Sequence, residues 1–528
     1  MIRPILRLHI LTGVLTICMT GSASAEKAAL HYRLQVRIQP ALHQLEAEAW
    51  IRHPPASQFY LFKGLSVREV IADGRPVPFH TDSSAAPLPY VPMATAVDVD
   101  AQDIQQLQVT YGGEISEVVA GVNMITPDLV ELASYAGWYP EYQGARRFTF
   151  ELQANVPKDF VTITNGRKKS VDAEQGRLIT EWSSYETGMD MVLLASPHFH
   201  QAAAEDQGNE VELYYYRLPP KVLKAKMDGL AAGMKQLTSL YGPPRVKGIL
   251  RLVYSPRAGW GYSRIPLVVM SEERARELLR GANGEANDFH NNCHEMAHFW
   301  WSVADPATPS DWINEGLAEF TAFRLTEGRF GEAFAQARLA EYRKDAGQNK
   351  TTTAIAETTS DSPDRYINRY EKTTMMFLEA QNRFGKPALN RVLKAIHTRF
   401  AGTGQATTAL FLEEVNRQMG KKAAVFFRTE LYRRPPSPTC ERKRALVIKR
   451  LRSTPFFRRP FVSPGSSYDA DSALLRGRCA GLCCGVCDIV KREAPVRYKQ
   501  PLQEIAGPTN EGLMRKGANC LLTTSTLL

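Results

Sequence analysis

Two histidines four residues apart, His294 and His298, place the strongest constraint on how this chain can fold. On an α-helix this spacing stacks both imidazoles on one face, about 6 Å apart along the axis, so both can bind one metal ion. The segment around them is apolar enough for a buried helix, and Glu295 follows the first histidine. A hydrolytic zinc site needs such a carboxylate as its general base. The pattern therefore predicts a zinc site built on a helix.

A third ligand is expected from a second helix. A polar loop that contains Pro306 and Pro309 is followed by an amphipathic run from Trp312. Within that run Glu315 is the predicted third ligand, which leaves a fourth coordination position open. Glu319 lies on the same face, where it is predicted to accept a hydrogen bond from a ligand histidine and fix its tautomer.

Simpler interpretations of these residues stay open. With eleven histidines in 528 residues, the His-Glu-x-x-His pattern arises by chance in on the order of one chain in a hundred. The histidines could then lie on the surface beside a solvated glutamate. His290 continues the spacing one turn earlier, but a fourth ligand there would close the site. We therefore favour a packing or orienting role for His290 over metal contact.

Three segments together resemble the aminopeptidase-N family of gluzincin zinc metallopeptidases, which includes leukotriene hydrolase. They are HEMAHFWW from residue 294, WINEGLAEF from residue 312 and RYEKTTMMFLE from residue 369. The resemblance implies that His294, His298 and Glu315 bind one zinc ion. It also implies that Glu295 is the general base and that Tyr370 stabilises the oxyanion.

The chain departs from the family pattern in two places. The family usually has eighteen residues between the second histidine and the ligand glutamate, whereas residues 299–314 make sixteen here. The GxMEN segment, which recognises a free amino terminus in the family, is replaced by GWGYSR at residues 259–264. Gly259, Gly261, Tyr262 and Arg264 are therefore the candidate substrate-binding residues. Arg264 would repel an ammonium group and could instead meet a substrate carboxylate.

The first 25 residues have the features of a secretory signal peptide. Arg3 and Arg7 precede an apolar core, and small residues lead up to Ala25, as a cleavage site requires. Cys18 follows the bulky Ile17, so a lipid anchor is the less favoured interpretation. No later window is long and apolar enough to span a bilayer. We therefore predict a periplasmic or secreted protein.

Residues 26–203 are predicted to form an antiparallel β domain, which the resemblance implies is saddle-like. Apolar and polar residues alternate over 32–38, 107–111 and 148–152, as in half-buried strands. Turn sequences at Asp73-Gly74, Gly112-Gly113 and Asn165-Gly166 are expected to close hairpins. Trp138-Tyr139-Pro140 is assigned to the core, although the resemblance would place it at the border of the active site.

Residues 204–436 mix strand and helix signals, and the resemblance implies a thermolysin-like α/β catalytic domain. Strands are expected over 211–215, 250–254 and 265–270, with Ser271 as the N-cap of a helix whose Glu272 and Glu273 complement the dipole. The helix that carries Glu315 is expected to end at Gly328. Further helices are expected over 221–241, 331–346, 364–384, 389–400, 407–419 and 426–434.

Residues 437–528 have a different character. They carry 16 Lys or Arg against 7 Asp or Glu, a net charge of +9 out of +10 for the whole chain, and six of the eight cysteines. No period organises them, so disorder is predicted. A disulfide or metal knuckle, a weak binder of anionic surfaces, and a segment joined by a frame change are the alternatives.

These patterns predict an exported α+β zinc metallopeptidase with peptide substrates, one zinc ion and no nucleic-acid partner. Its recognition of a free amino terminus is not expected to be strict. One alternative is an inactive relative that keeps the metal and acts as a docking protein, although the retained Glu295 argues against it. Another is an anionic-surface binder that acts through the basic tail.

Overall fold

The computed structural model describes residues 29–434, except 86–87, 89–90, 92, 117–120, 145–146, 207, 260 and 350–352. The predicted signal peptide, Trp260 and the basic tail at 437–528 lie outside these residues. The chain divides into two compact units, one that ends at His198 and one that begins at Phe199. The predicted boundary after residue 203 falls inside a strand, β16 (His200–Asp206), which pairs with β17 (Asn209–Tyr215) in the second unit.

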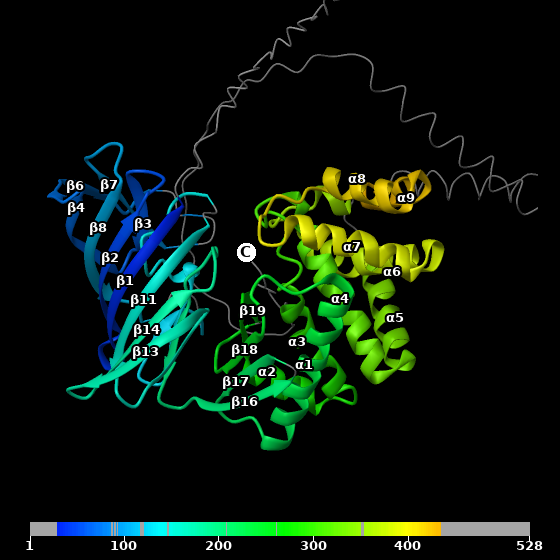
Figure 1. Cartoon of the computed structure of the whole chain (residues 1–528), viewed down its shortest axis with the longest axis horizontal. Helices are drawn as coiled ribbons and strands as arrows, with labels where there is room; N and C mark the ends of the chain where they lie inside the picture. Colours follow the sequence, from blue (N-terminus) through cyan, green and yellow to red (C-terminus); the bar gives the residue numbers. More distant parts are fainter. Residues whose placement is uncertain are drawn as a thin grey trace, which may run out of the picture. The chain divides into compact units, whose positions relative to one another are not determined.

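The first unit is built from strands (Figure 1, blue to cyan). It has an eight-stranded sheet of order β13-β14-β11-β1-β2-β8-β4-β5, a four-stranded sheet β12-β15-β10-β9 and a three-stranded sheet β3-β7-β6. The strands are β1 (Leu30–Gln39), β2 (Gln44–Arg52), β3 (Gln58–Phe62), β4 (Leu65–Ala72), β5 (Arg75–Pro76), β6 (Phe79–Asp82), β7 (Ala94–Val99), β8 (Gln106–Glu114), β9 (Met124–Ile125), β10 (Val130–Leu132), β11 (Phe148–Pro157), β12 (Val161–Thr164), β13 (Gly166–Glu174), β14 (Arg177–Ser184) and β15 (Leu193–Ser196).

Apolar and polar residues alternate along β1, which gives the eight-stranded sheet one buried face. Tyr32, Leu34 and Val36 point into the core, and the residues between them are more exposed. The sequence predicted antiparallel strands, but β1 and β11 are parallel, with Leu30 opposite Phe148. About a hundred residues separate these two strands in sequence, so no hairpin imposes the antiparallel direction on them.

Two of the three predicted hairpin turns are wrong. Asp73-Gly74 does join β4 to β5, with φ of 49° and 79°. Gly112-Gly113 instead lies within β8, where a Cβ on Gly113 would come 2.1 Å from the carbonyl oxygen of Gly64. Asn165-Gly166 lies between β12 and β13, which belong to different sheets. The hairpin between β13 and β14 turns at Gln175-Gly176, where both φ values are positive.

The aromatic run at Trp138-Tyr139 belongs to the core of the first unit. Both side chains are fully buried. The Trp138 indole donates to the Met191 carbonyl, and the Tyr139 hydroxyl donates to Asp190.

The second unit combines one mixed sheet with helices (Figure 1, green to yellow). The sheet order is β16-β17-β18-β20-β19, with β17, β18 and β20 parallel and both edge strands antiparallel. This mixed unit after a β-rich one confirms the predicted α+β class. Its remaining elements are β18 (Ile249–Ser255), β19 (Tyr262–Arg264), β20 (Leu267–Ser271), α1 (Pro220–Tyr241), α2 (Glu272–Arg280), α3 (Gly284–Ala297), α4 (Trp312–Phe330), α5 (Glu332–Gln348), the π-helical η5 (Ile367–Lys372), α6 (Thr373–Phe384), α7 (Lys386–Phe400), α8 (Thr408–Met419) and α9 (Lys421–Leu431).

Two local predictions in this unit need correction, and a third, the Ser271 N-cap, is confirmed with one addition. The run predicted as one strand over 265–270 is the turn and second strand of a hairpin between β19 and β20. α4 passes through Gly328 and ends at Phe330, where Gly331 follows with φ of +89°. Ser271 does cap α2, but the buried Glu272 reaches back to the backbone N–H groups of Tyr216 and Arg217 after β17.

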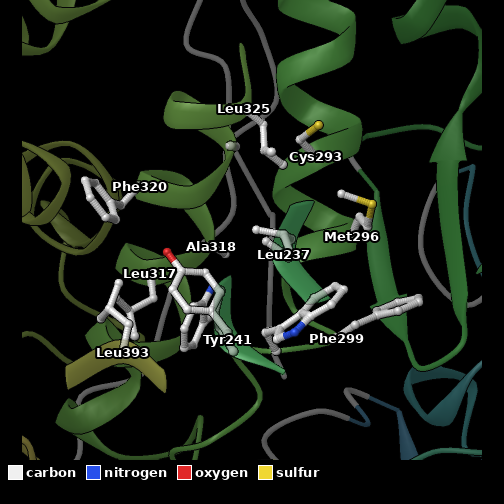
Figure 2. Packing of buried hydrophobic residues seen from close by; sticks show 14 of the residues in the cluster. Leu237, Tyr241, Cys293, Met296, Phe299, Leu317, Ala318, Phe320, Leu325 and Leu393 are labelled. Atoms are coloured by element: carbon white, nitrogen blue, oxygen red, sulfur yellow. The ribbon is translucent and has the colours of Figure 1, made fainter. Parts of the chain in front are cut away.

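The helices α3 and α4 are held by an apolar cluster that fixes their relative position. Cys293 and Met296 of α3 pack with Leu317 and Phe320 of α4, and α1 and α7 add side chains such as Tyr241 (Figure 2). All of these side chains are buried. Replacement of one such leucine by alanine typically costs about 2–5 kcal/mol, so the cluster is stiff enough to position polar groups between the two helices. In the described residues, no helix is long and apolar enough to cross a membrane.

Candidate metal centre

The C-terminal end of α3 carries both predicted histidine ligands. His294 lies in its last turn and His298 is the C-cap, with helical φ and ψ of −60° and −16°. Their ring centroids are 5.1 Å apart and the planes are almost perpendicular. The helical backbone therefore places both imidazoles on one face, as the four-residue spacing predicts.

Glu315, in the first turn of α4, completes the cluster. Its Oε2 atom lies 3.4 Å from Nε2 of His294 and 3.6 Å from Nε2 of His298. Candidate ligand atoms of the three residues lie within 4.8 Å of one another, and no other such group of three is found in the described parts of the chain. The sixteen-residue spacing is therefore long enough to bring Glu315 to the histidines.

The residues present fit a divalent metal. Oε2 of Glu315, Nε2 of His298 and Oε2 of Glu295 are buried without a hydrogen-bond partner among the described residues. Buried polar atoms of this kind are costly unless something satisfies them. Two imidazoles and one carboxylate with an open fourth position form a ligand set that suits zinc.

The pKa values follow from burial and mutual contact. Burial lowers the pKa of His298 to about 4, so its nitrogen is free of a second proton near neutral pH. Burial opposes ionisation of Glu315, but the nearby His298 and His294 lower its pKa to about 2. Burial also disfavours the charged form of His294, yet its contacts with the carboxylates of Glu315 and Glu319 raise its pKa to about 10. A metal that binds there must displace this proton.

Glu295 has the protonation behaviour of a general base. Burial raises its pKa to about 7, and the neighbouring His294 and the more distant Arg264 and Arg257 act in the opposite direction. A base works best when its pKa lies near the operating pH. The partly buried Glu295 is therefore ready to accept and return a proton beside the metal ligands.

Tyr370 reaches the same cluster from η5. Its ring stacks on His294, with centroids 5.3 Å apart and an interplanar angle of 11°. Its other stacking partner is Tyr366, at 4.8 Å. A hydrogen bond with Tyr370 also contributes to the low pKa of Glu315. The structure thus brings Tyr370 together with the three candidate ligands.

Gly316 explains how η5 comes so close to α4. A Cβ at this position would lie 2.1 Å from Cγ2 of Thr373 and 2.8 Å from the carbonyl oxygen of Arg369. Only glycine leaves room for this approach. The glycine after Glu315 thereby lets the segment that carries Tyr370 pack against the segment that carries the ligand.

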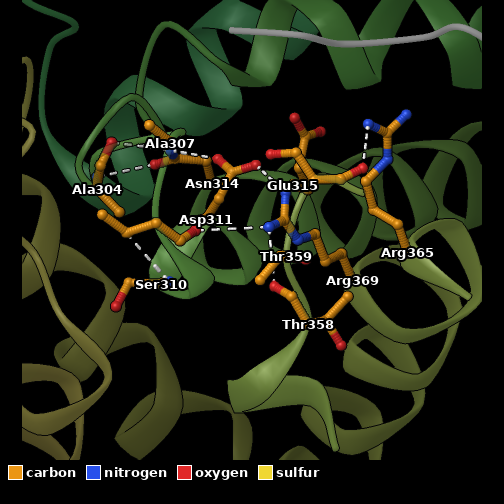
Figure 3. A network of polar contacts seen from close by, with 12 residues as sticks. Ala304, Ala307, Ser310, Asp311, Asn314, Glu315, Thr358, Thr359, Arg365 and Arg369 are labelled. Carbon is orange, nitrogen blue, oxygen red and sulfur yellow. Dashed lines mark hydrogen bonds and ion pairs between the residues drawn. The ribbon is translucent and has the colours of Figure 1, made fainter. Parts of the chain in front are cut away.

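A buried polar network also joins α4 to η5, and sequence reasoning missed it. Arg369, which is 1% exposed, donates to Asp311 at 2.5 Å and to the Thr358 carbonyl oxygen at 2.9 Å (Figure 3). Asn314 links Asp311 to the backbone of Ala304. Arg369 is the residue directly before Tyr370, and Asp311 lies four residues before Glu315. The Asp311–Arg369 pair therefore ties the two elements together. A lone Arg and a lone Asp 58 residues apart offered no local signal for this contact.

Glu319 lies where the sequence placed it, and His290 has an orienting position. Oε2 of Glu319 is 2.8 Å from Nδ1 of His294, and Oε1 is 2.8 Å from Nε2 of His290. Because Nδ1–H of His294 donates to Glu319, its Nε2 faces Glu315 and the metal position. His290 is outside the three-residue ligand group.

The predicted substrate-binding residues lie at the edge of the sheet. β19 holds Tyr262 and Arg264 and is the last strand of its sheet. Gly259 has φ of +76°, and a Cβ on Gly261 would lie 2.3 Å from Sδ of Met270. Gly261 is therefore explained by packing of β19 on β20. β19 contacts α3, the helix that carries the histidines, and the Arg264 charge lowers the pKa values of both Glu295 and His298.

Comparison with known proteins identifies the fold. No protein-family model and no curated protein matches the chain. The structure is similar to an M1 zinc metallopeptidase from Deinococcus radiodurans, with a TM-score of 0.61 and 16% identity over 78% of this chain and 95% of that one. It is also similar to native yeast LTA4 hydrolase, with a TM-score of 0.59 and 14% identity over 80% of this chain and 71% of that one. The chain therefore shares its fold with zinc metallopeptidases.

Proposed function

We propose that this protein is a zinc-dependent peptidase of the M1, or aminopeptidase-N, family. The observation that carries the proposal is the convergence of His294, His298 and Glu315 beside the partly buried Glu295. The fold shared with M1 zinc metallopeptidases supports it. The signal-peptide pattern of the first 25 residues supports export of the enzyme.

His294, His298 and Glu315 would hold one zinc ion, with Glu319 orienting His294. Zinc in such a site supplies a Lewis acid that polarises a carbonyl group and makes water more acidic. Glu295 takes a proton from the attacking water and returns it to the leaving amine. The Tyr370 hydroxyl donates a hydrogen bond to the oxygen that becomes negative in the transition state.

The substrates we propose are peptides without a strict requirement for a free amino terminus. Residues 256–271 carry Arg257 and Arg264 and no acidic residue. This segment, which includes β19 and β20, therefore offers no carboxylate to a substrate ammonium group. We expect a peptide and its N-acetylated form to be hydrolysed at rates within about tenfold of each other, since a lost charge-assisted hydrogen bond would cost more than that. A thousandfold preference for the free amine would show that an acid elsewhere recognises it.

The decisive experiment measures peptide hydrolysis and bound zinc together. Purified parent protein should digest a peptide library, lose activity with a chelator and regain it with zinc. Glu295→Gln should keep its zinc and lose turnover by about 10²–10⁴-fold, because the amide keeps the shape but cannot accept the proton. Parent-like turnover in the Glu295→Gln variant would contradict the assigned base.

The alternative is an inactive docking protein that keeps the metal. It predicts stoichiometric zinc in the parent but no hydrolysis of any peptide in the library. The Glu295 carboxylate, retained beside the three candidate ligands, favours the enzyme, because a docking protein has no use for a base there.

A further inference from the structure

Glu319 is surrounded by hydrogen-bond donors on both carboxylate oxygens. Oε2 faces Nδ1 of His294 at 2.8 Å. Oε1 faces Nε2 of His290 at 2.8 Å and also accepts from the hydroxyl group of Tyr342. Arg338 lies 3.6 Å from the same oxygen. Since His294 is the candidate ligand, the other three contacts all act on Oε1, the oxygen that does not face His294.

Two of these partners come from α5, which carries none of the residues of the zinc pattern. Arg338 and Tyr342 are one helical turn apart, and Nε of Arg338 donates to the Tyr342 hydroxyl oxygen at 2.9 Å. Arg338 also donates to Oδ1 of Asn287, near the start of α3, at 3.3 Å. The pair thereby links α5 to both α3 and α4.

The third partner, His290, has its own support. It is 1% exposed, and its Nδ1 atom lies 3.4 Å from the Thr326 hydroxyl oxygen. That hydroxyl donates to the Ala322 carbonyl at 2.7 Å. The ionised Glu319 carboxylate can only accept hydrogen bonds, so the His290 ring presents its Nε2–H to Oε1. With donors on each oxygen, the carboxylate can neither rotate nor pair elsewhere without losing a contact.

We infer that His290, Arg338 and Tyr342 are positioning residues that set the affinity of the metal site by holding Glu319 against His294. The inference rests on the proposed metal site, and it makes α5 a part of that site. Partners that orient a ligand histidine typically contribute 10–100-fold to metal affinity. Each of these three acts one contact further out, so we expect about tenfold for each.

The test measures the zinc dissociation constant of the full-length protein by competition with a chromophoric chelator. Tyr342→Phe should weaken zinc binding about tenfold, and Arg338→Met should do the same. The matched control is Tyr254→Phe, which also removes a buried hydroxyl. That hydroxyl contacts Lys226 and, on α3, Asn292, but not Glu319. An equal loss of affinity in Tyr254→Phe would assign the effect to general loosening of α3 and overturn the inference.

A double-mutant cycle tests whether Tyr342 acts through Glu319. Glu319→Gln should weaken zinc binding 10–100-fold by itself, and Tyr342→Phe should then have no further effect. An undiminished tenfold effect in the Glu319→Gln background would overturn the inference, as would unchanged affinity in the single variants. These outcomes need no turnover, so they are separate from failure of the proposed peptidase activity. A parent protein that bound no zinc would overturn both.

Discussion

The two sides of the metal centre are built in opposite ways. On the side of Glu319, donors from two helices, α3 and α5, contact both oxygens of one carboxylate. On the side of Glu295, buried atoms of Glu295, His298 and Glu315 have no hydrogen-bond partner among the described residues. A buried polar atom that lacks a hydrogen-bond partner costs free energy. The contrast therefore separates the part of the site that must stay rigid from the part that must accept a metal and a substrate.

The largest effects are expected from two substitutions that each remove one carboxylate, one on each side of the site. Glu315→Ala should lose zinc during dialysis and with it all turnover, because a bond to the metal is deleted. Glu319→Ala should keep zinc with 10–100-fold weaker affinity, because only an orienting contact is lost. Metal analysis after dialysis separates the two. A zinc-loaded Glu315→Ala beside a metal-free Glu319→Ala would move the ligand assignment by one helical turn.

A smaller effect is expected where α4 meets η5. Gly316→Ala places a methyl group against Thr373 and the backbone of Arg369, so the two segments must separate. Overpacking of this kind costs about 1–3 kcal/mol, and turnover should fall because Tyr370 moves away from Glu315. The measurements are Tm and kcat.

Gly328→Ala is the matched control for this substitution. It lies in the same helix, with nothing within 4 Å of its added Cβ, and should stabilise the helix by up to about 1 kcal/mol. Equal behaviour of the two variants would show that α4 and η5 are not in tight contact at Gly316.

The comparison also shows which features of the site can be predicted from the sequence. Helical spacing alone pairs His294 with His298 and Glu315 with Glu319, because residues four apart share a face. The donors behind Glu319 and the Asp311–Arg369 pair depend on contacts between distant segments, and no local pattern marks them. The same holds in the β unit, where alternation predicts β1 but not its parallel partner 118 residues away.

Glycine pairs illustrate this limit within one residue type. Asp73-Gly74 turns the chain because its own backbone adopts positive φ. Gly112-Gly113 lies within a strand because the backbones of Leu45 and Gly64 pass close by. The first cause is local and readable in a sequence, whereas the second is visible only once the sheet is assembled.

The smallest expected effect concerns Glu371, which sharpens the contrast between satisfied and unsatisfied carboxylates. It is buried in η5, and its Oε2 atom has no hydrogen-bond partner among the described residues. Burial, followed by the negative charges of Asp345 and Glu319, raises its pKa to about 8. The folded state therefore holds a proton that the unfolded chain releases near pH 4.5, and stability is lost as the pH rises from about 4.5 to 8.

Glu371→Gln cannot ionise and avoids this loss. Its Tm relative to the parent should therefore rise between pH 5 and pH 9 by at least about 2–4 °C, which is the shift that about 1 kcal/mol produces in a domain of this size. The exposed Glu413→Gln on α8 is the control and should show no such rise. A constant Tm difference for Glu371→Gln across this range would mean that the carboxylate finds a cationic partner in the folded protein.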